Sequence, residues 1–245
     1  MQPPIEPPRV IVLWCPDWPV TAARAAAGIA HDAPVALIAK GRVLASSPAA
    51  RAESVRRGIR VREAQAHCPG LVTLDYDSAL DARAFEPLVA AVEELTPGVQ
   101  VLRPGMCVVR VRGAARYYGS ERAAALALVG RLDELGAGGA RAGIADGIFT
   151  AEQAARRSPD RVAVVPAGGA RDYLSPLDVG LLEEAGPEPA TSIVTLLRRL
   201  GIRTLGQFAA LGHDDVRTRF GAQGARLRAL AAGSDSWPIV PRTPP

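Results

Sequence analysis

The thiol and imidazole groups of this chain are too scattered to build a metal site. Six such side chains lie far apart in the sequence, without metal-ligand spacing: Cys15, Cys68, Cys107, His31, His67 and His213. Zinc sites need ligands at short, regular spacings, and an odd number of isolated cysteines is typical of free thiols in a reducing cytosol. We therefore predict no metal site built from cysteine or histidine and no disulfide framework.

Arginine supplies nearly all of the positive charge of the chain. Lys40 is the only lysine, every other cation is an arginine, and the formal net charge is +4. Guanidinium groups bind phosphates bidentately, which suits a nucleic-acid partner. The abundance of alanine, glycine and proline is equally compatible with a GC-rich genome that encodes arginine frequently, so composition leaves both explanations open.

The elements that must position these side chains form an α/β pattern followed by an all-helical one. Apolar runs and helical periodicities predict a sheet backed by helices up to about residue 165, and helices alone from 172 to 233. The expected strands are residues 9–14, 33–39, 41–46, 71–74, 98–102, 106–111, 140–145 and 162–165. The expected helices before the helical region are residues 20–29, 49–57, 61–67, 78–95, 121–135 and 150–157, with a loop around Tyr117-Tyr118-Gly119 and a tight turn at Lys40-Gly41.

Length and hydropathy agree with a folded protein of one to three domains. The chain has 245 residues, of which 48% are hydrophobic and 22% charged, enough to bury a sizeable core. No apolar stretch approaches the roughly 18 residues of a membrane span. We expect a cytoplasmic protein with no membrane partner.

Five segments, in this order, resemble the Y-family translesion DNA polymerases, the UmuC- and DinB-like proteins. They are the opening apolar strand, Arg57-Gly58-Ile59-Arg60, Arg141-Ala142-Gly143-Ile144-Ala145, Leu200–Phe208, and Phe220–Leu227 with Gly233-Ser234-Asp235. The resemblance implies an α+β core with a palm sheet backed by helices, small fingers, a helix-hairpin-helix-like thumb and no little finger. The implied boundaries are palm 1–16 and 77–167, fingers 17–76, thumb 168–236, and a proline-rich tail 237–245.

The same resemblance implies that the catalytic acids are missing. Polymerase chemistry uses two divalent cations held by carboxylates, because hard Mg²⁺ prefers oxygen ligands. The family's motifs place Trp14 at the first acid, Pro16 at the second metal-contacting position, and Gly105 and Met106 at the acidic pair. Asp17 alone would supply one ligand, too few for a two-metal site.

The residues that would hold the nucleotide are also replaced. By resemblance, Ala52 stands where the family has a stacking tyrosine, Val55 where it has a phosphate-binding arginine, and Glu152 where it has a phosphate-contacting lysine. A carboxylate repels a triphosphate. We therefore predict no catalytic residue, no cofactor and no metal.

Contacts with DNA through the helical region are an open expectation. The thumb hairpin that presents backbone N–H groups to phosphate corresponds to Glu188-Pro189-Ala190, where a proline and a glutamate disfavour phosphate binding. Six residues could still contact a DNA backbone: Arg198, Arg199, Arg203, Gly221, Gly224 and Arg226. A solvated helix face explains these arginines as well, and the group Arg51–Arg62 could face either single-stranded template or solvent. Trp18 could pack in the core or stack on a base.

Loss of all acids in an arginine- and alanine-rich sequence resembles the ImuB-type, catalytically inactive branch of the family. It implies a cytoplasmic, nucleoid-associated scaffold of the bacterial mutasome, active in DNA-damage-induced (SOS) translesion synthesis and mutagenesis. The implied partners are a RecA-like protein (ImuA or its analogue), an error-prone replicative-type polymerase, the sliding clamp through segments beyond this chain, and possibly primer-template or single-stranded DNA. The alternatives are an active translesion polymerase with an atypical metal site and a DNA-binding module without enzymatic activity.

Overall fold

The computed structural model describes residues 7–185, 190–235 and 238–242. It separates into two compact units, one containing Val108–Val129 and the described part of Arg141–Val240, the other containing Trp14–Cys107 and Gly130–Ala140. Within the described residues, no helix is long and apolar enough to cross a membrane.

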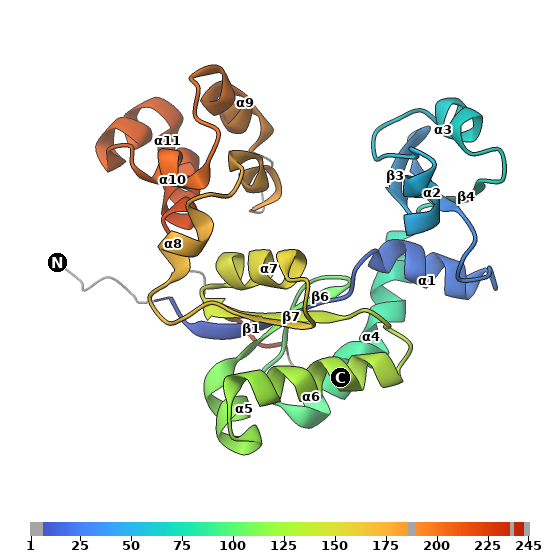
Figure 1. Ribbon diagram of the computed structural model, residues 1–245, viewed down its shortest axis with the longest axis horizontal. Helices are drawn as coiled ribbons and strands as arrows, with labels where there is room; N and C mark the ends of the chain where they lie inside the picture. Colours follow the sequence, from blue (N-terminus) through green and yellow to red (C-terminus); the bar gives the residue numbers. More distant parts are fainter. Residues whose placement is uncertain (1–6, 186–189, 236–237, 243–245) are drawn as a thin grey trace. The chain divides into compact units, whose positions relative to one another are not determined.

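A five-stranded sheet with the order β5-β6-β1-β7-β8 is the centre of the fold (Figure 1). Its strands are β1 (Arg9–Trp14), β5 (Gln100–Arg103), β6 (Met106–Arg110), β7 (Arg141–Asp146) and β8 (Val162–Val164). The four residues between the ends of β1 are fully or almost fully buried, as expected for a central strand that is covered on both faces. The apolar run at the start of the sequence is thus a central strand, as predicted.

Helix α7 (Ile148–Arg157) covers one face of β7 and β1, and α5 (Val111–Tyr118) with α6 (Glu121–Glu134) covers the other (Figure 1). The close approach of α7 to β7 depends on Gly143, because a Cβ at this position would lie 2.0 Å from the carbonyl oxygen of Ala151. Helix α5 corrects our expectation of a strand to residue 111 and a packed loop around Tyr117. The helix ends at Tyr118 and is capped by Gly119, whose φ is 84°, and Tyr117 is 82% exposed.

A second, three-stranded sheet with the order β3-β2-β4 lies between residues 35 and 75. Its elements are β2 (Val35–Ala39), β3 (Arg42–Ser46), α2 (Pro48–Ala52), α3 (Val61–His67) and β4 (Val72–Asp75), preceded by α1 (Trp18–Ala26) and followed by α4 (Ser78–Leu95). The β2–β3 hairpin turns at Lys40-Gly41, both with positive φ, as predicted. Helix α2 is shorter than the predicted 49–57, because Ser54 takes a φ of 63° and directs the chain back to the sheet.

The described residues from 170 to 231 are helical apart from their connections, in agreement with the helical region predicted for 172–233. They form α8 (Ala170–Leu174), the 3₁₀ helix η1 (Val179–Glu184), α9 (Thr191–Arg199), α10 (Leu205–Ala209) and α11 (His213–Ala231). One apolar cluster holds them together, with Phe208, Leu197 and Leu182 fully buried, and Phe149 of α7 belongs to it. Helix α11 is interrupted at Gly221, which has φ 67° and ψ −162°.

Candidate functional site

The ends of β1 and β6 bring the three predicted acid positions together. The backbone N–H of Cys15, one residue after β1, donates a hydrogen bond of 2.8 Å to the carbonyl oxygen of Gly105, one residue before β6. Trp14 and Met106 are the neighbouring residues on the two strands. The structure therefore brings Trp14, Gly105 and Met106 close together, as the family resemblance implies.

Gly105 has no room for any side chain. It is buried in a turn with φ 82°, a conformation that favours glycine. A Cβ on Gly105 would lie 2.3 Å from the Cβ and 2.8 Å from the Cγ of Trp18, and real Cβ atoms essentially never approach this closely. An aspartate at Gly105 would therefore require a rearrangement of α1.

Trp18 is a core residue. Its side chain is 6% exposed, its indole N–H donates to the carbonyl oxygen of Asp81 at 3.2 Å, and its ring meets Phe85 edge-on with 5.2 Å between centroids. A buried, hydrogen-bonded indole is well suited to packing. Of the two interpretations of Trp18, packing is confirmed.

The other side chains at this point are apolar and protected from water. Met106 and Cys107 are each 1% exposed and Cys15 is 5% exposed. Burial, with a smaller contribution from the charge of Asp133, raises the pKa of the Cys15 thiol to about 12, and burial also raises the pKa of Cys107. Both thiols are therefore protonated at neutral pH.

The nearest carboxylate in the sequence, Asp17, is held by an arginine. Its two carboxylate oxygens accept hydrogen bonds from the Arg51 guanidinium at 2.9 and 2.7 Å, and Arg51 also donates to the backbone carbonyl of Ser46. Asp17 precedes α1 with a φ of 53°, in the loop where we expected it. Among the described residues, no group of three or more histidine, cysteine, aspartate or glutamate side chains could hold a metal ion.

The positions predicted to have lost nucleotide contacts lie in different environments. Ala52 is exposed at the end of α2. Val55 is fully buried in a cluster with Val43 and Ala64, and its carbonyl accepts a hydrogen bond of 2.8 Å from the Ser46 hydroxyl. The structure thus assigns Val55 to the core below the second sheet, where a charged side chain would be costly.

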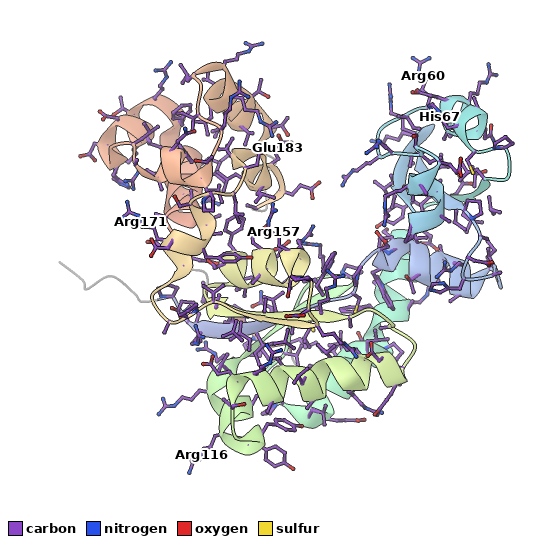
Figure 2. All side chains as sticks on the ribbon, viewed as in Figure 1. Arg60, His67, Arg116, Arg157, Arg171 and Glu183 are labelled. Atoms are coloured by element: carbon purple, nitrogen blue, oxygen red, sulfur yellow. The ribbon has the colours of Figure 1, made fainter. Side chains whose placement is uncertain are left out.

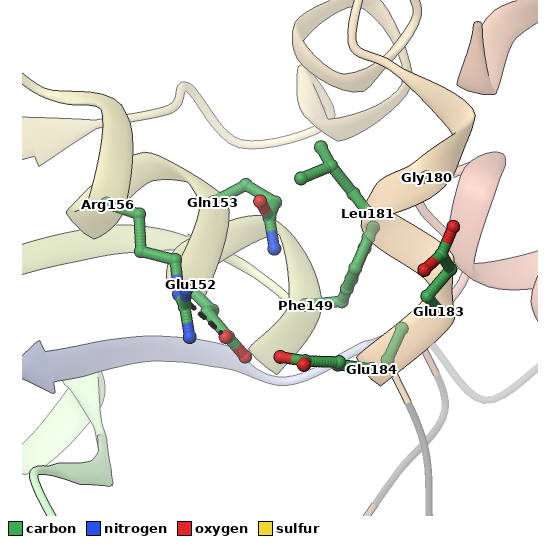
Figure 3. A pocket seen from close by; sticks show the side chains of 9 residues that line it. Phe149, Glu152, Gln153, Arg156, Gly180, Leu181, Glu183 and Glu184 are labelled. Atoms are coloured by element: carbon green, nitrogen blue, oxygen red, sulfur yellow. Dashed lines mark ion pairs between the residues drawn. The ribbon is translucent and has the colours of Figure 1, made fainter. Parts of the chain in front are cut away.

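Glu152 on α7 is part of an acidic pocket (Figure 3). Its carboxylate pairs with the Nε of Arg156 at 2.9 Å, and its side chain is 16% exposed. Phe149 and Gln153 lie beside it on α7, and Glu183 and Glu184 line the opposite wall on η1. These negative charges disfavour a phosphate group at this point.

Among the candidate DNA contacts of the helical region, one arginine forms ion pairs within the chain and the others are exposed. Arg198 pairs with Asp178 at 2.9 Å and with Glu183 at 3.2 Å. A hydrogen bond from the Gly180 N–H, reinforced by Arg198, lowers the pKa of Asp178. The other three candidate arginines, Arg199, Arg203 and Arg226, have exposed side chains.

The two glycines of α11 have different roles. Gly221 is exposed at the interruption of the helix, whereas Gly224 is buried, and a Cβ there would lie 2.2 Å from the Cβ of Phe220. Of the hairpin segment Glu188-Pro189-Ala190, the first two residues lie outside the described residues. Around the second sheet, the arginines Arg51, Arg56, Arg57, Arg60 and Arg62 are all exposed, and Figure 2 shows Arg60 projecting away from the sheet.

One contact between distant segments had no clear signal in the sequence. The carboxylate of Asp235 accepts a hydrogen bond of 2.8 Å from the backbone N–H of Phe149, at the start of α7, and is 2% exposed. The residue before α7 is Gly147, which has no capping side chain, so Asp235 supplies the cap across 86 residues of sequence. The only sequence signal for Asp235 was its position in the segment Gly233-Ser234-Asp235, which resembles the family.

Comparison with known proteins places these features in context. The sequence profile of the impB/mucB/samB family matches residues 18–156. The chain is 32% identical over 187 residues to the protein ImuB of Caulobacter vibrioides, covering 76% of this chain and 39% of that protein. It is 28% identical over 202 residues to DNA polymerase IV of Dehalococcoides mccartyi, covering 82% and 50%.

Solved structures agree on the fold. A ternary insertion complex of Dbh DNA polymerase superimposes with a TM-score of 0.78 at 16% identity, covering 94% of this chain and 69% of that one. DinB from Sulfolobus solfataricus gives a TM-score of 0.72 at 15% identity. The predicted fold, a Y-family polymerase core, is confirmed. The chain spans half or less of the length of these curated relatives.

Proposed function

The chain belongs to the impB/mucB/samB family, and on that premise we propose that it is a non-catalytic Y-family scaffold acting in translesion synthesis and mutagenesis after DNA damage. One observation carries the proposal, namely the contact that closes Gly105 against Trp18 at the expected place of a metal-binding acid. A carboxylate cannot be accommodated there without moving a buried tryptophan.

The chemistry of phosphoryl transfer explains why this contact matters. Two cations must bridge the attacking oxygen and the triphosphate, and each needs carboxylate oxygens. The three positions hold an indole, a hydrogen atom and a thioether, of which only the thioether can coordinate a metal, and only a soft one. Met106 is also 1% exposed. These features support a protein that keeps a polymerase shape without its catalytic step.

As a scaffold, the protein would act through partners. We propose the palm at residues 1–16 and 77–167, the fingers at 17–76 and the thumb at 168–236. The partners would be those of a mutasome, namely a RecA-like protein, an error-prone replicative-type polymerase and the sliding clamp, at the nucleoid in the cytoplasm. The 32% identity to ImuB of Caulobacter vibrioides is compatible with this assignment, and the contact between Trp18 and Gly105 is what favours it over a working polymerase.

A second candidate function, a DNA-binding module without enzymatic activity, is favoured by the exposed arginines. Arg199, Arg203 and Arg226 are exposed on the helical region. Around the second sheet four more arginines, Arg56, Arg57, Arg60 and Arg62, are exposed, beside Arg51, which pairs with Asp17. Arginine contacts with phosphates give binding that weakens steeply with salt. This property is compatible with a scaffold that also touches primer-template DNA.

Primer extension separates these possibilities. The chain is incubated with a labelled primer-template, all four nucleotides and either Mg²⁺ or Mn²⁺, beside a DNA polymerase IV as positive control. We expect no extension with either ion. Template-dependent extension by this chain, abolished by Asp17→Asn, would instead establish an active polymerase with an atypical metal site and overturn the proposal.

Anisotropy measurements with the same DNA, at several salt concentrations, test the second candidate. Salt-dependent binding to DNA without primer extension would support the DNA-binding module. If the chain binds DNA and mutasome proteins at the same time, it would act both as a DNA-binding module and as a scaffold. A chain that binds neither DNA nor any mutasome protein would contradict both assignments.

A further inference from the structure

Helix α5 presents a basic and aromatic face to solvent. Its inner side is anchored by Val111 and Ala114, which are buried, and helical spacing turns the opposite side outwards. The outer face of α5 consists of exposed residues only, namely Arg112, Gly113, Arg116 and Tyr117. Figure 2 shows the Arg116 side chain pointing away from the ribbon.

Tyr117 is the most exposed large hydrophobic side chain among the described residues, with 82% of its surface in contact with solvent. Its ring meets that of Tyr118 edge-on, with 4.8 Å between centroids and an interplanar angle of 80°. Tyr118 is half-buried, so it restrains the exposed ring. Tyrosine is one of the residue types that contribute most to binding at protein interfaces, where its apolar ring is covered.

The positive charge of the outer face is not offset by the surrounding sequence. The chain has arginines but no acidic residue between Glu94 and Glu121. Glu121 itself is bound by Arg9, whose Nε and a terminal nitrogen each lie 2.7 Å from one of its carboxylate oxygens. Helix α5 begins after the exposed Arg110, which forms no side-chain cap, and its first turn has no acid. Because a helix N-terminus is itself partially positive, these arginines add to the potential instead of balancing it.

Gly113 leaves space on this face that the fold of the chain does not require. Glycine in the middle of a helix weakens it relative to alanine. Gly113 is not among the glycines with positive φ, and an ideal Cβ on it would meet nothing within 4 Å beyond the backbone of its own helix, among the described residues. The open position is adjacent to Arg116 and Tyr117 at helical spacing. A partner could therefore approach the helix closely at Gly113.

These features favour an acidic polypeptide over a nucleic acid. Carboxylates accept paired hydrogen bonds from guanidinium groups, and arginine and tyrosine dominate the affinity of many protein interfaces. Single strands of nucleic acid are held instead along basic grooves, with successive bases stacked on aromatic rings. The rings of Tyr117 and Tyr118 are nearly perpendicular and offer no two parallel platforms. Helix α5 has eight residues and is therefore only about 12 Å long.

We propose that the outer face of α5 is a docking surface for an acidic segment of a partner protein. Carboxylates of the segment pair with Arg112 and Arg116, and an apolar side chain packs against Tyr117 in the space above Gly113. The inference rests on the proposed scaffold function, and it gives that scaffold one defined surface for a partner.

The test is a titration of the isotopically labelled full chain, followed by nuclear magnetic resonance. The probe is a hexapeptide of alternating glutamate and leucine, blocked at both ends. We expect saturable shifts of the Gly113 amide and Tyr117 ring signals, with a dissociation constant on the order of millimolar, because each exposed ion pair contributes little. The same peptide with glutamine in place of glutamate should bind at least about tenfold more weakly.

Three variants locate the surface. Arg112→Ala combined with Arg116→Ala, and Tyr117→Ala alone, should each weaken binding of the probe by about tenfold. Gly113→Leu keeps every charge but fills the open space, so it should weaken binding by about as much. Leucine is a better helix former than glycine, so a thermal unfolding curve should show that this variant is at least as stable as the parent chain.

Arg217→Ala combined with Arg219→Ala is the matched control. It removes the same charge from exposed positions of α11 in the same unit and should leave binding of the probe unchanged. The proposal is overturned if the glutamine peptide binds as well as the acidic one, if any of the three α5 variants leaves binding unchanged, or if the control weakens it equally. It is also overturned if a thymidine oligonucleotide binds α5 more tightly than the acidic peptide, which would assign this face to nucleic acid.

Failure here is distinguishable from failure of the scaffold function. Nucleotide incorporation in primer extension would overturn the scaffold without changing the titration. Loss of the shifts caused by the acidic peptide would overturn the assignment of α5 and leave the non-catalytic scaffold standing.

Discussion

Trp18 and Gly105 are in direct contact, and the contact leaves space only for hydrogen at position 105. The Cβ of Trp18 would lie 2.3 Å from a Cβ on Gly105, and the tryptophan is held from behind by Phe85 and by its hydrogen bond to the Asp81 carbonyl. The position that we propose as the equivalent of a catalytic acid is therefore part of the core. No single substitution introduces a carboxylate there without moving Trp18.

The first prediction concerns that substitution. Gly105→Asp should destabilise the chain by about 2–5 kcal/mol, since it combines a positive φ with an overpacked contact. Urea unfolding measures the change. Trp18→Ala should not relieve it, because the closest atom is the Trp18 Cβ, which alanine also carries.

Gly28 provides the matched control for the backbone contribution. It lies in the same unit, has a φ of 65°, and has nothing within 4 Å of an ideal Cβ. Gly28→Asp should therefore cost only about 1 kcal/mol. Equal losses for the two substitutions would show that the Trp18 contact is not what closes position 105.

The second prediction concerns the cap that Asp235 provides to α7. Asp235→Ala leaves the Phe149 N–H without its acceptor in a buried position and should lower the free energy of unfolding by about 1–3 kcal/mol. Asp235→Asn keeps an acceptor oxygen and should cost less. Hydrogen exchange at the Phe149 amide should accelerate with alanine more than with asparagine.

The N-terminal cap of α4, which is exposed, serves as the control for the buried Asp235 cap of α7. Asp77 accepts from the N–H groups of Ala79 and Leu80 at 2.8 and 3.1 Å on the surface, where water can replace it. Asp77→Ala should therefore cost less than Asp235→Ala. The reverse order would mean that burial does not strengthen the Asp235 cap.

Local signals explain which elements were predictable. Helix α4 runs from Ser78 to Leu95, as predicted, because its apolar spacing is helical and Asp77 caps its start. Helix α5 was missed because Val109-Arg110-Val111 alternates like a strand, and Gly113 with two tyrosines is a poor helix former. The one available signal was Gly119, a C-terminal cap.

Contacts between distant residues explain what was not predictable at the site. The family resemblance alone implied that Trp14, Gly105 and Met106 lie at one site. It did not indicate that Trp18 fills the space above Gly105, or that Val55 is a core residue of the second sheet. Both depend on tertiary packing, which a single sequence does not encode as a local pattern.

The third prediction follows from the buried thiol of Cys15. Burial raises its pKa to about 12, whereas an unfolded thiol has a pKa near 8.5. Below pH 8.5 both states keep the proton and stability is unaffected. Above that pH only the unfolded chain loses it, so stability should fall by up to about 1.4 kcal/mol per pH unit until pH 12.

Urea midpoints at pH 8, 9.5 and 10.5, under reducing conditions, measure this slope. Cys15→Ala should make the slope shallower, and its cavity cost adds an offset that does not depend on pH. Identical slopes for the two proteins would show that Cys15 titrates alike in the folded and unfolded chains.

The fourth prediction compares arginines of the helical region that are exposed with Arg198, which forms ion pairs. Arg199 and Arg226 are exposed, whereas Arg198 is held by Asp178 and Glu183. If this region binds a phosphate backbone, Arg199→Ala and Arg226→Ala should each reduce the slope of log affinity against log salt concentration by about 1. Arg198→Ala should leave that slope unchanged, as anisotropy with a primer-template can measure.

Arg198→Ala should instead lower the free energy of unfolding, by an amount that depends on pH. Arg198 helps to lower the pKa of Asp178, so the contribution of the pair is present above the usual aspartate value and is lost as the pH falls through the lowered one. The variant should therefore be less stable than the parent chain at pH 7 and approach it in acid. A salt slope that falls for Arg198→Ala, with stability unchanged at pH 7, would show that its ion pairs open to bind DNA.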